Sequence, residues 1–246
     1  MKNEFSWQKT LLWVSLFSIA MGFFESAVVV YLRTIYFPHG FGFPLAPIDT
    51  HIALIELIRE ASTILMLVSI GFLAGENSAR RFAYFIFSFA IWDISYYIFL
   101  KIIDYWPDSI MTWDVLFLIP ILWTSPVIAP VIASITMIIL ALLIIIQEGR
   151  NNKIIISRAV WFLLIAGSII IIAAFIWDFS GYMLENNAID HIWSFNYNQE
   201  LLKSAINYIP KKFNWFLFSL GEFIILSGIG VTAVKSGIFR KINLIR

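Results

Sequence analysis

Six apolar stretches, each long enough to cross a lipid bilayer, constrain the fold of this chain more than any other feature of its sequence. A helix needs about 20 predominantly apolar residues to span the hydrocarbon layer. The chain is 60% hydrophobic and 13% charged, which is outside the range of soluble globular proteins. We therefore predict an all-α fold, a polytopic transmembrane helix bundle that forms one integral membrane domain over residues 1–246. The predicted spans are about 10–32, 51–74, 82–100, 126–146, 156–177 and 213–234.

Residues 101–125 are not expected to form a simple transmembrane span, because this aromatic and acidic segment is interrupted by Pro107 and Pro120. Irregular backbone at membrane depth must be shielded by protein. We therefore expect one interfacial or re-entrant segment here, in addition to the six spans. The polar loop after the fifth span is expected to contain a short helix near residues 198–209.

The distribution of charged residues predicts how the bundle is oriented. Eleven of the 17 Lys and Arg residues lie in the N-terminal segment, the two short turns and the C-terminal tail, and five lie in the three longer loops. Acidic residues outside the spans show the opposite bias, with three on the first side and eight on the second. The positive-inside rule therefore predicts that both termini are cytoplasmic and that the longer loops face outward.

The stretch 51–74 is the strongest candidate for a functional site, because Glu56, Arg59 and Glu60 all lie in its first third. Ionisable residues inside a membrane span are costly and are usually functional. Residues three and four positions apart lie on the same face of a helix, so Glu56 can face both Arg59 and Glu60. The alternative is a structural ion pair that joins helices, although two carboxylates exceed what one arginine neutralises.

Three further carboxylates, Glu25, Asp93 and Glu222, lie in other spans at a similar predicted depth. At 1.5 Å per residue, all five intramembrane carboxylates lie roughly 8–14 Å below the outer surface. We therefore expect a buried polar cavity in the outer half of the bundle. Its predicted lining is Glu25, Glu56, Arg59, Glu60, Asp93 and Glu222.

Aromatic residues are predicted to form the mouth of this cavity. Tyr97 follows Asp93 by four residues and can hydrogen-bond that carboxyl or contact a ligand. Trp106 and Trp113 fall on the outer side, and Asp114 follows the second of them. Tryptophan at headgroup level and aspartate at a helix start are also ordinary features of a membrane interface. We expect Tyr97, Trp106, Trp113 and Asp114 to contact a bound molecule.

The segments GFFESAVVVYLRTIYFPHGFGFPL around Glu25, IELIREA around Glu56, and WDISYYIFLKIIDYWPDSIMTWDVLFLIPILWTSPVIAP after Trp92 are distinctive. In these segments the chain resembles an uncharacterised family of bacterial multipass membrane proteins, over about residues 20–135. No activity is assigned to that family, so the resemblance implies no chemistry. It does imply a bacterial plasma (inner) membrane.

Five carboxylates near one arginine in a low-dielectric layer cannot all be ionised unless a cation lies among them. Two classes of function suit such a set of residues. The first is binding, with acid–base conversion as an extension, of a lipophilic or amphipathic small molecule. In this interpretation Glu56, Glu60 and Asp93 exchange protons and Arg59 is the electrostatic anchor. The second is a cation- or proton-coupled transporter, since oxygen ligands at one depth suit a hard cation.

The aromatic outer face and the weak internal symmetry favour the first class over a carrier built from inverted repeats. A structural subunit of a membrane complex is the third interpretation. The expected partners are the lipid bilayer and a lipophilic small molecule or cation. The net charge of +1 and the absence of a basic stripe give no reason to expect nucleic acid. The sequence indicates no metal site, and it leaves any cofactor and the oligomeric state unknown.

Overall fold

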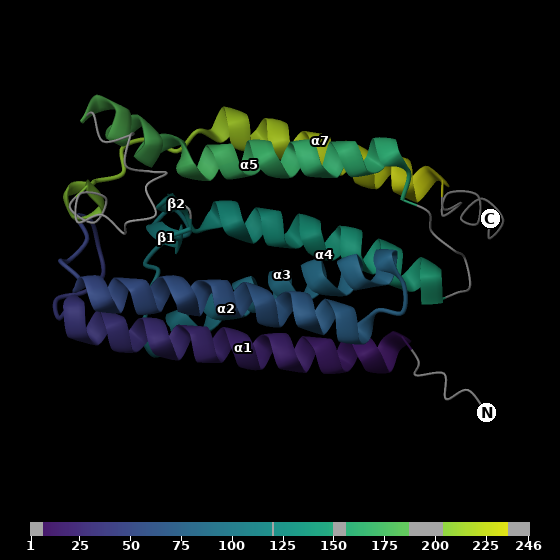
Figure 1. Cartoon of the computed structure of the whole chain (residues 1–246), viewed down its shortest axis with the longest axis horizontal. Coiled ribbons are helices and arrows are strands. Elements are labelled where there is room, and N and C mark those ends of the chain that lie inside the picture. The colour runs from purple at the N-terminus through teal and green to yellow at the C-terminus, as the bar shows by residue number, and fades with distance from the viewer. Residues whose placement is uncertain (1–6, 120, 150–155, 187–203, 236–246) are drawn as a thin grey trace.

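The computed structural model describes residues 7–119, 121–149, 156–186 and 204–235. This part of the chain contains six helices that are long and apolar enough to cross a membrane (Figure 1). They are α1 (Trp7–Tyr36), α2 (Thr50–Ala74), α3 (Ser78–Ile103), α4 (Ile128–Gly149), α5 (Arg158–Glu185) and α7 (Trp215–Lys235). The predicted polytopic bundle of six spans is confirmed.

Two helices extend well beyond their predicted ends. The first continues from Leu32 to Tyr36, and α5 continues from Trp177 to Glu185. The extra turn of α1 places Arg33 inside the helix, whereas the sequence analysis placed it in the following loop. Asp49 caps the start of α2, because its side chain accepts a hydrogen bond of 2.8 Å from the backbone N–H of His51. Of the helix expected near 198–209, residues 204–207 are helical, and 198–203 lie outside the described residues.

The helices form two groups with α4 between them (Figure 1). Helices α1, α2 and α4 all pack on α3, which is therefore the central helix of the larger group. The second group is the pair α5 and α7, which pack mainly on each other and contact α4 through α7. The start of α1 and the end of α7 lie at the same end of the bundle, as an even number of spans requires.

Helices α5 and α7 approach most closely at Gly167 and Gly221. A Cβ atom added to either glycine would lie 2.8 Å from the backbone carbonyl oxygen of the other. Small residues at a membrane helix contact let the two backbones approach closely. The sequence of each helix thus provides the flat surface that this pairing needs.

The segment expected to be interfacial or re-entrant forms an antiparallel hairpin between the two helix groups (Figure 1). Its strands are β1 (Trp113–Phe117) and β2 (Trp123–Pro126). The backbone N–H of Leu118, beyond the end of β1, donates a 2.9 Å hydrogen bond to Glu60 Oε2. Glu60 is ten residues into α2, about 15 Å along the helix axis. The hairpin therefore enters the bundle, and we define the end of the bundle that holds it as the hairpin end.

No strands were predicted from the sequence. The hairpin can be explained by the hydrogen-bonding needs of its backbone. Backbone polar groups away from water must be satisfied internally. The two strands pair through their backbone groups in the register Trp113↔Pro126 and Val115↔Thr124. The Glu60 carboxylate accepts the Leu118 N–H. A short ladder can therefore exist inside a helical bundle.

Candidate functional site

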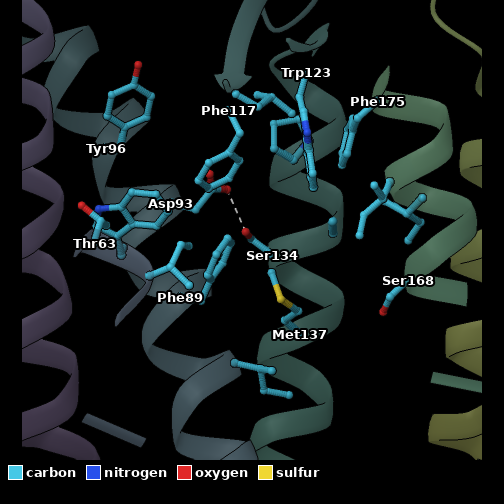
Figure 2. A pocket seen from close by; sticks show the side chains of 18 of the residues that line it. Thr63, Phe89, Asp93, Tyr96, Phe117, Trp123, Ser134, Met137, Ser168 and Phe175 are labelled. Atoms are coloured by element: carbon cyan, nitrogen blue, oxygen red, sulfur yellow. Dashed lines mark hydrogen bonds between the residues drawn. The ribbon is translucent and has the colours of Figure 1, made fainter. Parts of the chain in front are cut away.

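A cavity of about 760 Å³ lies between the two helix groups, next to the hairpin. Apolar and aromatic side chains form most of its wall, and Figure 2 shows Phe89, Phe117, Trp123 and Phe175 among them. Small-molecule sites in proteins have volumes of about 300–1,000 Å³ and are mainly apolar with a few placed polar groups. The polar groups in this wall include five carboxyls, which belong to Glu25, Glu60, Asp93, Asp114 and Glu222.

Most of the predicted site residues meet at this cavity, but three do not line it. Glu56 is not among the lining residues, and its carboxylate is paired with Arg59 on the same helix. Trp106 and Trp113 do not form the mouth either. Trp106 packs against the Arg33 guanidinium, and Trp113 packs against Phe213 with ring centroids 6.4 Å apart. The residues that do line it are Glu25, Arg59, Glu60, Asp93, Tyr97, Asp114 and Glu222.

Arg59 joins two carboxylates from two helices. Its Nε donates a 2.7 Å hydrogen bond to Glu56 Oε2 on the same helix, and its Nη1 donates a short hydrogen bond to Glu25 Oε1 on α1. The first contact follows from the i,i+3 spacing, whereas the second depends on how α1 packs. Helices α1 and α2 pack mainly on α3, and the contact between Arg59 and Glu25 joins them directly. Two of the guanidinium donors are therefore already used, one within α2 and one between α2 and α1.

Glu60 lines the cavity, but one of its oxygens holds the hairpin. Oε2 accepts the Leu118 N–H, and the residue is 8% exposed. A buried backbone N–H without a partner would cost about 1–3 kcal/mol, so this contact stabilises the inserted hairpin. Glu60 thus has a structural role that the sequence could not indicate, because the hairpin itself was not predicted.

Asp93 is a cavity carboxyl with a single neutral side-chain partner. Its Oδ2 accepts a 2.7 Å hydrogen bond from the Ser134 hydroxyl of α4, as Figure 2 shows. No ion pair to Asp93 is present in the part of the chain that the structure describes. A carboxyl in an apolar wall with one neutral partner is suited to receive a proton or a cation from a ligand.

Glu222 is arranged similarly on the other side of α4. Its Oε2 accepts a 2.8 Å hydrogen bond from the Thr136 hydroxyl, and its Oε1 is buried with no hydrogen-bond partner among the described residues. The indole N–H groups of Trp92 and Trp123, which also line the cavity, likewise lack a partner there. Buried polar atoms are normally satisfied, so these three atoms, which belong to cavity-lining residues, are unusual.

A second ion cluster at the hairpin end was missed by the sequence analysis. Arg33 is 6% exposed and its guanidinium lies 4.3 Å from the ring centroid of Phe41 and 4.0 Å from that of Trp106. It pairs with Asp104 at 3.1 Å and with Asp114 at 3.8 Å. Asp114 also accepts a 3.1 Å hydrogen bond from the Tyr97 hydroxyl. The cluster thus fixes the first strand of the hairpin to α1 and α3.

Asp114 provides a pH-dependent prediction. Burial raises the pKa of this carboxyl, which lies in the hairpin outside the six helices, to about 6, although Arg33 lowers it. A carboxyl whose pKa is raised from 3.8 in the folded state stabilises the fold below about pH 4, and this stabilisation is lost as the pH rises through 6. The difference corresponds to on the order of 3 kcal/mol.

We therefore expect the melting temperature of the wild type to fall relative to that of Asp114→Asn between pH 4 and pH 7. Thermal unfolding of both proteins in one detergent across this range measures the effect. Glu76→Gln, which changes an exposed carboxyl outside the cavity, is the control and should follow the wild type. A constant difference between wild type and Asp114→Asn would contradict the assignment.

The hydroxyl groups on α4 that bind Asp93 and Glu222 were not predicted either, although the sequence contains a pattern that indicates them. Ser134 and Thr136 are the only hydroxyl-bearing residues in the apolar run 128–146. An isolated polar residue in such a run indicates a specific contact across helices. The contacts they make, to Asp93 and Glu222, are those that position the two carboxyls.

Comparison with known protein families, with curated proteins and with solved structures gives no match. Within the described residues, no group of three or more His, Cys, Asp or Glu side chains is placed to hold a metal ion. The fold and the cavity together define a bundle of six helices long and apolar enough to cross a membrane, with a mainly apolar cavity between its two helix groups.

Proposed function

We propose that this protein is a multipass membrane protein that binds a lipophilic or amphipathic small molecule in the cavity between its two helix groups. The observation that supports this most is the combination of size and wall chemistry. The volume of about 760 Å³ suits a small molecule, the wall is mainly apolar and aromatic, and the unpaired carboxyl of Asp93 faces the space. As part of the proposal, the membrane is the bacterial plasma membrane, both termini are cytoplasmic, and the hairpin end faces outward.

A route from the lipid supports the proposal. Four cavity-lining residues are exposed, namely Ala61 of α2, Ile119 beyond β1, and Ser168 and Ile172 of α5. We place the opening of the cavity to the bundle surface between α2 and α5, which carry three of them. Both helices are of membrane-spanning length, so this opening faces lipid. A lipophilic molecule dissolved in the bilayer can enter there without crossing water.

Asp93 is the carboxyl that we propose for proton exchange with a bound molecule. The roles first proposed for Glu56 and Glu60 have less geometric support, because Glu56 is held by Arg59 and Glu60 holds the hairpin. Likewise, Arg59 already donates to two carboxylates. A general acid or base needs an oxygen within hydrogen-bond reach of the ligand. Among these carboxyls, Asp93 lines the cavity and has a neutral hydroxyl as its partner.

A proton-coupled transporter is the second candidate, and one observation favours it. Asp93 and Glu222 contact opposite sides of α4 and have no cationic partner among the described residues, as carboxyls that load and release protons require. The two candidates separate in proteoliposomes. A carrier moves its cargo in response to a pH gradient, whereas a binding protein or enzyme shows no gradient-driven flux.

Filling the cavity tests the proposed function directly. Ala133 of α4 lines the cavity, so Ala133→Phe is expected to weaken binding of the neutral fluorescent probe 1-aminoanthracene at least tenfold. The reason is that the added ring occupies ligand space. Ile135→Phe, two residues along on the exposed side of the same helix, is the matched control and should bind like the wild type. Equal saturable binding by all three proteins, after subtraction of the empty-micelle signal, would contradict the proposal.

A further inference from the structure

The charges around the cavity do not balance. Arg59 is paired with Glu25 and Glu56, and Arg33 is paired with Asp104 and Asp114. Glu60 has a backbone N–H as its partner. In the described part of the chain, Asp93 and Glu222 are therefore left with only one neutral hydroxyl each.

Glu222 provides a second, independent observation. It is 7% exposed, it lines the cavity, and its Oε1 has no hydrogen-bond partner among the described residues. An orphaned buried carboxylate oxygen costs more free energy than an orphaned neutral group. Two carboxyls from opposite helix groups thus belong to residues that line one cavity, and each has a neutral hydroxyl as its partner.

The wall beside these carboxyls consists of linked aromatic rings. Phe89 lies 5.3 Å from Trp92 and 6.3 Å from Phe117, and Phe117 lies 5.5 Å from Trp123, measured between ring centroids. Figure 2 shows Phe89, Phe117 and Trp123 in the same wall as the Asp93–Ser134 hydrogen bond. Ring faces attract cations through their quadrupole, and aromatic cages are a known way to hold quaternary ammonium groups.

We infer that the ligand of this cavity is a lipophilic organic cation, whose charge is balanced by Asp93 and Glu222 and whose apolar body packs on the aromatic wall. The inference rests on the proposed function, because it names the chemical class of the bound molecule. With a neutral lipophilic ligand, both carboxyls would avoid an uncompensated buried charge only by staying protonated. An anionic one would add a like charge to a wall that already has an excess of acids, and this is unfavourable at low dielectric.

Tetraphenylphosphonium and tetraphenylborate test the inference, because they have nearly the same shape and opposite charge. Each is titrated against protein-bound 1-aminoanthracene, and the ratio of the two half-displacement concentrations is measured. We expect the cation to displace the probe at a concentration at least tenfold lower. Asp93→Asn, which keeps the side-chain shape, should reduce this preference at least tenfold. Glu222→Gln should reduce it to a smaller extent, and Glu76→Gln should leave it unchanged.

The outcomes separate the two claims. If both ions displace the probe equally, the cavity binds lipophilic molecules without regard to charge, and the cation inference is overturned while the proposed function stands. If the preference survives both carboxamide variants, its source lies elsewhere and the inference is also overturned. If the wild type shows no cavity-dependent probe binding, the proposed function fails with it. Should Asp93→Asn not fold, the wild-type ratio together with Glu222→Gln decides.

Discussion

Replacing Arg59 with methionine is expected to lower the free energy of unfolding by about 3–5 kcal/mol, because it leaves buried carboxylates without their cation. Arg59 donates to both Glu25 and Glu56, and its side chain is 19% exposed. The loss arises from the uncompensated charges more than from the contacts themselves. Unfolding of the detergent-solubilised protein by increasing fractions of sodium dodecyl sulfate, followed by circular dichroism, measures it.

A triple variant separates this structural role from a role in ligand binding. In Glu25→Gln/Glu56→Gln/Arg59→Met all three charges are removed, and replacing a complete buried ion cluster is often close to neutral. We therefore expect the triple variant to recover most of the stability lost by Arg59→Met. It should also bind 1-aminoanthracene like the wild type, since Asp93 and the aromatic wall are intact. A triple variant that is stable but does not bind would instead make Arg59 a ligand anchor.

The close contact between α5 and α7 yields the second large effect. Gly221→Leu is expected to destabilise the protein by about 3 kcal/mol, because the added side chain meets the backbone of the facing helix and cannot be relieved by a rotamer change. Even a Cβ atom at this position would lie 2.8 Å from the Gly167 carbonyl oxygen and 2.6 Å from Ile171 Cγ1. The same unfolding assay measures the loss.

Gly230 offers the matched control for this prediction. It lies on the same helix, and no atom lies within 4 Å of the position that its Cβ would take. Gly230→Leu should therefore be neutral or slightly stabilising, since glycine in a helix interior is about 0.5–1 kcal/mol less favourable than alanine. If both leucine variants destabilised the protein equally, the effect would come from helix α7 in general and the glycine contact would not be responsible.

The sequence was sufficient to predict the six spans, because bilayer thickness imposes a minimum length of apolar helix. It was also sufficient for the contact between Glu56 and Arg59, which follows from helical spacing. The partner of Arg59 on α1 could not be predicted, because residue spacing says nothing about which helices pack together. The same limit applies to Ser134 and Thr136, whose hydroxyls meet Asp93 and Glu222 only in the folded bundle.

The hairpin accounts for most of the other differences from expectation. Proline and aromatic residues in 101–125 indicated an irregular segment, but its strands pair only because the surrounding helices exclude water. Glu60 Oε2 accepts the backbone N–H of Leu118, and Asp114 pairs with Arg33, so both residues have structural contacts that were not predicted from the sequence. Trp106 was predicted at the mouth of the cavity, but the loop before the hairpin places its ring against the Arg33 guanidinium.

Native mass spectrometry of the mildly solubilised protein, wild type beside Ala133→Phe, tests whether the cavity binds a small molecule. We expect the wild type to carry a bound small molecule and the folded Ala133→Phe variant to have lost it, while Ile135→Phe retains it. The mass of that molecule, and its charge in solution, would also show whether it is an organic cation. A wild type that releases no small molecule, or a molecule that remains bound equally in Ala133→Phe, would contradict the claim that the cavity is a binding site.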